Sequence, residues 1–128
     1  MKNQAGARWI PAFGLMALMA WPGAQAEDGV GPQQLLIGQS ITLQGGKNDY
    51  GTAVLDGVET YLSLVNKQGG VAGRKVVVKV LDDDNKSAQA EANARQLITQ
   101  DKVFLVFGSI EGGPSTAVMK ATTELKVP

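Results

Sequence analysis

The chain has 128 residues, with 12 basic and 12 acidic side chains and a formal net charge of zero at neutral pH. It contains no block of basic residues, so we do not expect a nucleic-acid partner. Cys and His are both absent, which excludes disulfides, thiolate chemistry, a Ser-His-Asp triad and the commonest metal ligand. We therefore expect a protein that is not an enzyme and that binds no cofactor or metal.

The N-terminal segment, residues 1–26, is typical of a secretory signal peptide. Lys2 and Arg8 form a small positive region, an apolar stretch follows at 10–21, and Ala24-Gln25-Ala26 has small residues where signal peptidase cleaves. The sequence predicts cleavage after Ala26 and export to the periplasm. A membrane anchor or a buried helix is the alternative, but the apolar stretch is shorter than the roughly 20 residues that a spanning helix needs.

The chain after residue 26 is long enough for one small domain. Residues 27–34 are predicted to be a flexible lead-in. The nearly continuous apolar run 35–41 predicts a strand that is buried on both faces. A polar, Gly-rich loop follows, and Asn48 or Asp49 is predicted to cap a helix. This helix has an inward face formed by Val54, Val58, Tyr61, Leu62 and Val65.

The same alternation continues to the end of the sequence. The predicted elements are a strand at 75–81, a helix at 88–100 capped by Asp84 or Ser87, a fully apolar strand at 103–107, a Gly-rich loop at 108–113 and a helix with Pro114 at its first position. Strands that alternate with helices predict a parallel sheet with right-handed crossovers. We therefore expect an α/β protein of order βαβαβα, with three layers and any ligand site beyond the C-terminal ends of the strands.

Five short motifs occur in one order along this alternation. They are IGQSITL at 37–43, DYG at 49–51, NKQGGVAGR at 66–74, VLDDD at 80–84 and FGSIEGGPS at 107–115. Together they resemble the N-terminal lobe of type I periplasmic solute-binding proteins of the branched-chain amino-acid (Leu/Ile/Val) family. The resemblance implies that residues 35–128 are a partial N-terminal lobe of such a domain. It also implies binding of an amino acid or similar small polar solute, and partnership with the membrane subunits of an ABC importer.

The resemblance also implies a ligand site. Relatives hold the ligand carboxylate with the loop and helix N-terminus that correspond to residues 109–115, which suits an anion because free N–H groups and a positive dipole end meet there. The implied ligand-binding residues are Tyr50, Ser109, Ile110, Glu111, Gly112, Gly113 and Ser115. Gly112 stands where amino-acid binders place a serine, and Glu111 would repel a carboxylate, so a different small solute is an open alternative. Ordinary packing of Tyr50 and a solvated loop charge at Glu111 are the competing interpretations.

Three alternatives to the main interpretation remain at this point. Asp82, Asp83 and Asp84 could bind Mg²⁺, but a strand exit followed by a helix N-terminus explains them better. An extracytoplasmic sensor domain would share the same lobe, and a small secreted enzyme would need a carboxylate such as Glu111 or Asp83 for activity.

The strand at 103–107 is expected at an open sheet edge, so the piece after residue 26 should be marginally stable alone and should not bind leucine tightly.

Overall fold

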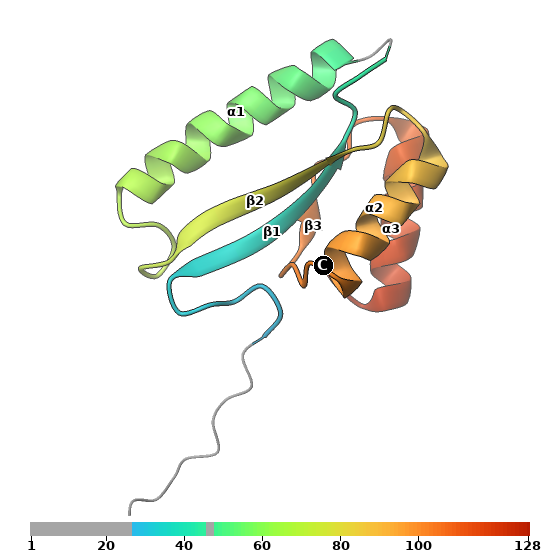
Figure 1. The fold of residues 1–128 in the computed structure, drawn as a ribbon. Coiled ribbons are helices and arrows are strands. Elements are labelled where there is room, and N and C mark those ends of the chain that lie inside the picture. The colour runs from blue at the N-terminus through green and yellow to red at the C-terminus, as the bar shows by residue number, and fades with distance from the viewer. Residues whose placement is uncertain (1–26, 46–47) are drawn as a thin grey trace, which may run out of the picture.

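The computed structural model describes residues 27–45 and 48–128, and the predicted signal peptide lies outside these residues. The elements follow the order β1 (Gln34–Ile41), α1 (Asn48–Lys67), β2 (Lys75–Asp82), α2 (Ser87–Thr99), β3 (Val106–Phe107) and α3 (Gly112–Leu125). The three strands form a parallel sheet in the order β2-β1-β3. Helix α1 lies on one face of this sheet, and α2 and α3 lie on the other (Figure 1). The predicted α/β architecture is confirmed.

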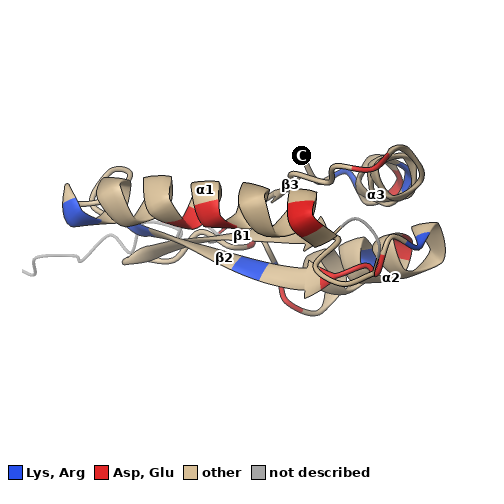
Figure 2. Ribbon diagram, turned by 90° about the horizontal axis from the view of Figure 1, so that it is seen from above, with Lys and Arg blue, Asp and Glu red and all other residues tan. Residues whose placement is uncertain are grey.

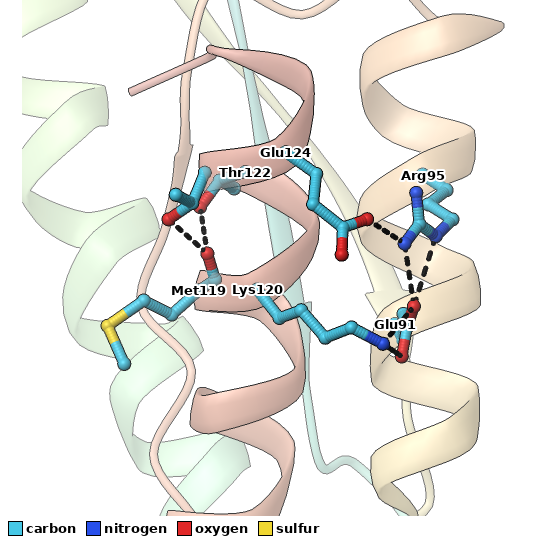
Figure 3. Close-up of polar contacts among 7 residues, drawn as sticks. Glu91, Arg95, Met119, Lys120, Thr122 and Glu124 are labelled. Carbon is cyan, nitrogen blue, oxygen red and sulfur yellow. Dashed lines mark hydrogen bonds and ion pairs between the residues drawn. The ribbon is translucent and has the colours of Figure 1, made fainter.

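The face covered by α2 and α3 holds the core. Small buried side chains let the two helices approach closely: Ala90, Ala94, Val118 and Ala121. A second buried cluster, Leu97, Ile98 and Val103, packs against partly buried residues of β1 and β2, Leu36 and Leu81. Ion pairs also join the two helices, since Arg95 of α2 bonds Glu124 of α3, and Lys120 of α3 reaches Glu91 of α2 (Figure 3).

The opposite face is less covered. Helix α1 lies above the sheet in Figure 2, and its main contacts are with β2. The predicted inward face of α1 is therefore partly wrong, because Tyr61 is 65% exposed and Val54 is 36% exposed. Within the described residues, no element covers the β3 side of α1. An apolar groove of about 400 Å³ runs there, with Ile37, Val58 and Phe107 among its lining residues.

Strand β3 is shorter than the predicted strand at 103–107. Only Val106 and Phe107 pair regularly, with Gly38 and Gln39 of β1. The backbone N–H of Phe104 donates to Leu36, and the carbonyl of the very next residue accepts from Gly38. In a regular strand, the backbone N–H and C=O groups of successive residues point to opposite neighbouring strands. Phe104 and Leu105 are adjacent and both bond β1, so the ladder is interrupted here as it is at a bulge.

Strand β3 is the edge of the sheet among the described residues, as expected. The N–H of Val106 donates to the carbonyl of Pro128 over 2.8 Å, so the last residues lie along this edge. At the other end of the chain, Leu36 N–H donates to the carbonyl of Gly29, and Lys75 N–H donates to that of Gln33. The predicted lead-in is thus tied to the sheet, and β1 begins at Gln34 rather than at residue 35.

The predicted helix caps are corrected by the structure. Asn48 and Asp49 lie inside the first turn of α1 rather than before it. The residue before α2 is Lys86, which makes no side-chain cap, and neither Asp84 nor Ser87 caps this helix. Helix α3 begins at Gly112, so Pro114 is its third residue. A proline is tolerated there because the first N–H groups of a helix have no intrahelical acceptor.

The NKQGGVAGR motif, residues 66–74, has a structural role at the end of the sheet where β2 begins. The side-chain amide of Asn66 pairs with both backbone groups of Val76, and each of the two bonds is 2.8 Å long. Gly70 has a φ of +72°, and a Cβ there would lie 1.9 Å from the carbonyl oxygen of Arg74. The guanidinium of Arg74 donates to the carbonyl of Gly31 over 2.9 Å. The motif therefore fixes the connection from α1 to β2.

Candidate functional site

The candidate site lies at the C-terminal ends of the parallel strands. An opening of about 500 Å³ is lined by Tyr50, Ala53 and Val54 of α1 and by Ile110 and Glu111 of the loop before α3. The first turn of α1 reaches this position because Gly51 packs against the end of β1, where a Cβ would meet the carbonyl oxygen of Thr42. The structure thus brings three of the predicted site residues together, namely Tyr50, Ile110 and Glu111.

The other predicted site residues, Ser109, Gly112, Gly113 and Ser115, do not line this opening. Gly112 and Gly113 form the first turn of α3, where backbone N–H groups lack an intrahelical acceptor. The N–H of Ser115 is the first one used inside the helix and donates to the carbonyl of Glu111 over 2.8 Å. The N–H of Ser115 is therefore used inside the helix, because α3 begins two residues earlier than expected.

The two glycines of this turn differ in their surroundings. A Cβ on Gly112 would meet no atom within 4 Å, whereas one on Gly113 would lie 2.7 Å from the hydroxyl of Ser87. A side chain at 113 therefore requires the Ser87 hydroxyl to move, whereas position 112 has room for one. The serine expected at 112 in amino-acid binders would fit in this fold, so its absence concerns the site and not the packing.

Two polar atoms beside the loop are buried without partners among the described residues. Gln39 is fully buried on β1, and its side-chain nitrogen donates to the carbonyl of Gly108 over 3.3 Å. Its oxygen, Oε1, has no hydrogen-bond partner, and neither has the hydroxyl of Ser109. Gln39 was not among the predicted site residues. The sequence feature that could have indicated it is a polar amide in the nearly apolar run 35–41, which ends near the candidate site.

The three aspartates at the end of β2, Asp82, Asp83 and Asp84, form a structural cluster. Asp83 is fully buried, and its carboxylate accepts from the hydroxyls of Thr42 over 2.7 Å and Ser40 over 3.2 Å. It also accepts from the backbone N–H of Asn85 over 3.0 Å. Protein donors therefore occupy this carboxylate, which supports the strand-exit interpretation over a metal site. No group of three potential metal ligands occurs in the described part of the chain.

Asp82 joins the loops that follow β1 and β2. Its carboxylate accepts from the backbone N–H groups of Leu43 and Asp84, both over 2.9 Å, and from the side chain of Gln44 over 2.7 Å. Burial alone would raise the pKa of Asp82, but these hydrogen bonds outweigh it and lower the pKa. Asp82 therefore stays ionised and holds the loop that leads to Tyr50.

Comparisons with known proteins identify the family. The sequence profile of the periplasmic binding protein family matches residues 34–128. The chain belongs to this family. The family prediction made from the five motifs is confirmed. No helix among residues 27–45 and 48–128 has both the length and the apolar character needed to cross a membrane.

Individual relatives agree with this assignment. The chain is similar to Leu/Ile/Val-binding protein homolog 3 of Brucella melitensis, with 32% identity over 90 residues, 70% of this chain and 24% of the relative. Isoleucine-bound LivJ of Streptococcus pneumoniae superposes with a TM-score of 0.72 at 29% identity, covering 75% of this chain and 28% of LivJ. A putative branched-chain amino acid ABC transporter of Rhodospirillum rubrum gives 0.71 at 27% identity, covering 74% and 28%. The chain thus spans about a quarter of the length of these relatives.

Proposed function

We propose that this chain belongs to the solute-binding component of an ABC importer, which acts in the periplasm and binds an amino acid or a similar small polar solute. The observation that carries the proposal is the match to the periplasmic binding protein family over residues 34–128. The relatives named above include a Leu/Ile/Val-binding homolog and an isoleucine complex. Export through cleavage after Ala26 and partnership with importer membrane subunits are part of the same proposal.

The geometry of the opening supports a role in solute binding. In parallel α/β sheets, ligands bind beyond the carboxyl ends of the strands. The opening between α1 and the loop before α3 lies there, with the exposed ring of Tyr50 on one side and Glu111 on the other. The first turn of α3 begins directly after Glu111, and the backbone N–H groups of Gly112 and Gly113 there have the character that suits a carboxylate. An aromatic ring, an acidic side chain and backbone donors together suit a small solute that carries both a cationic and an anionic group.

The negative charge of Glu111 bears on which solute is bound. Glu111 is partly buried at the rim of the opening, so it favours a cationic or hydroxyl-bearing group and disfavours a second carboxylate. We infer that neutral amino acids bind more tightly than glutamate or aspartate. Like charges at close range in a site disfavour binding, and opposite charges favour it.

The proposed function is tested on the full-length gene product isolated from the periplasm of its native host. Its intact mass reports the site of signal cleavage and the length of the mature chain. Calorimetry with leucine, isoleucine and valine, and with glutamate as a charged control, then measures binding. Micromolar or tighter binding of a neutral amino acid with weak binding of glutamate is expected. Absence of binding by every amino acid would refute the amino-acid proposal.

A further inference from the structure

The amide of Gln39 is buried beside the candidate site with only one of its two ends satisfied. The residue is fully buried, its nitrogen donates to the Gly108 carbonyl over 3.3 Å, and its oxygen has no partner among the described residues. A buried acceptor without a partner loses its hydration and gains nothing in return. A methionine of similar size would fill the same space without this loss, and it would give up only the 3.3 Å bond to the carbonyl of the exposed Gly108.

Gln39 lies on the sheet face that α1 covers. A Cβ on Gly38 would meet Leu97 and Val103 on the opposite face, and the hydroxyl of Ser40 accepts from Asn93 of α2. Successive strand residues alternate between faces, so Gln39 points away from α2. Its register partner on β3 is Phe107, which lines the apolar groove beside α1.

The Gln39 amide lies against the first residue of the site loop. Gly108 has a φ of +72°, and a Cβ there would be 2.7 Å from the Gln39 nitrogen. Ser109, whose hydroxyl also lacks a partner, follows Gly108 directly. Ile110 and Glu111, which line the opening, come next. The Gln39 amide therefore contacts the residue that begins the site loop, and the unsatisfied Ser109 hydroxyl belongs to the next residue of that loop.

We propose that Gln39 determines solute specificity, with its Oε1 atom accepting a hydrogen bond from an N–H or O–H group of the bound solute. The inference deepens the proposed function and rests on it. Because Oε1 is covered in this ligand-free state, solute entry displaces the loop at Ser109–Glu111. The bond from Gln39 to Gly108 holds the same loop in the absence of solute. The solute class is one with an ammonium or hydroxyl donor beside its carboxylate.

The inference is tested with a set of ligands that differ in this donor. Leucine carries an ammonium group, 2-hydroxy-4-methylpentanoate carries a hydroxyl and 4-methylpentanoate carries neither. Calorimetry on the full-length gene product compares the wild type with Gln39→Met, and the change in ligand preference isolates the contact. A site built around a hydrogen bond rejects an analogue that lacks the group. We expect the wild type to prefer leucine over 4-methylpentanoate by about tenfold or more and Gln39→Met to lose most of this preference.

Two controls separate the specificity role from a structural role. Gln39→Glu keeps the acceptor, so it should retain the preference for leucine, and the hydroxy acid reports whether the donor must be charged. The melting temperature of ligand-free Gln39→Met should not fall, because removal of the unsatisfied oxygen offsets the loss of the 3.3 Å bond to Gly108. An unchanged preference for leucine in Gln39→Met would overturn the inference, because it would mean that Oε1 does not contact the solute donor.

The outcome also distinguishes the inference from the proposed function. If the wild type binds none of the neutral amino acids, the proposed function fails, and the melting temperature then decides about Gln39. A Gln39→Met protein that is less stable than the wild type would show that the amide contributes more to the fold through Gly108 than its unsatisfied oxygen costs. The inference would be wrong in that case as well.

Discussion

Replacement of Asp83 should destabilise the protein more than replacement of any neighbouring acidic residue. The carboxylate is fully buried and receives three hydrogen bonds, from Ser40, Thr42 and Asn85. These bonds join the end of β1 to the turn between β2 and α2. A hydrogen bond to a charged group contributes about 1.5–3 kcal/mol, compared with about 0.5–1.5 kcal/mol for a neutral one.

Asp83→Asn keeps the shape of the side chain but removes the charge. The amide oxygen can still accept from Thr42 and Asn85, so the expected loss is the difference between charged and neutral bonds, about 2 kcal/mol in total. For a domain of this size, that loss lowers the melting temperature by roughly 8–16 °C. Asp83→Ala leaves all three donors unsatisfied and should prevent stable folding.

The urea midpoint followed by circular dichroism measures this effect. Asp84→Asn is the matched control, because the Asp84 side chain is 44% exposed and its ion pair in the described part of the chain is with the exposed Lys86. Pairs of this kind contribute little. If Asp83→Asn and Asp84→Asn shift the urea midpoint equally, the hydrogen-bond network around Asp83 does not have the stabilising role argued above.

Three further predictions follow from single contacts. Gly73→Ala should lower the free energy of unfolding by about 1 kcal/mol, because the backbone there is left-handed. Gly70 has a similar φ, and a new Cβ would lie 1.9 Å from a carbonyl oxygen. Gly70→Ala should therefore lower the free energy of unfolding, measured in urea, at least twice as much. The pKa of Asp82 is lowered in the folded state, so its ionised carboxylate stabilises the fold at pH values above the unfolded-state pKa. The free energy of unfolding should therefore decline as the pH falls below roughly 4, and it should decline less steeply in Asp82→Asn. Gly112→Ser should leave the melting temperature unchanged and tighten leucine binding, while Gly113→Ser, which meets Ser87, should lower the melting temperature.

The alternation of elements was predictable because it depends on local signals. Each strand of the sheet falls within or next to a predicted apolar run, and Gly69 and Gly70 follow the end of α1 as predicted. The length of β3 was not predictable in this way. The apolar run at 103–107 satisfies the strand pattern, but the bonds of Phe104 and Leu105 to β1 interrupt the ladder, and pairing between distant residues cannot be seen in a local pattern.

The faces of α1 show the same limit. Val54 and Tyr61 have the spacing of buried residues, yet both are exposed because no described element covers the β3 side of the helix. The site was predictable as far as architecture and resemblance could place it, at the strand ends near Tyr50 and Glu111. The use of the Ser115 N–H inside α3 was not predictable, because it depends on where the helix begins, and two residues decide whether an N–H group is free. Gln39 was missed because burial of a polar side chain becomes visible only in the folded chain.

The motif at residues 66–74 and the candidate site lie at opposite ends of the sheet. Asn66, Gly70 and Arg74 fix the entry to β2 through backbone contacts, and none of them lines the opening near Tyr50. The contacts of this motif therefore concern the fold. We expect specificity to come from residues at the other end, where the resemblance places a serine at the position of Gly112 and where Gln39 is only half satisfied. Variants of Gln39 and Gly112 are thus more informative about the solute than any substitution within the motif.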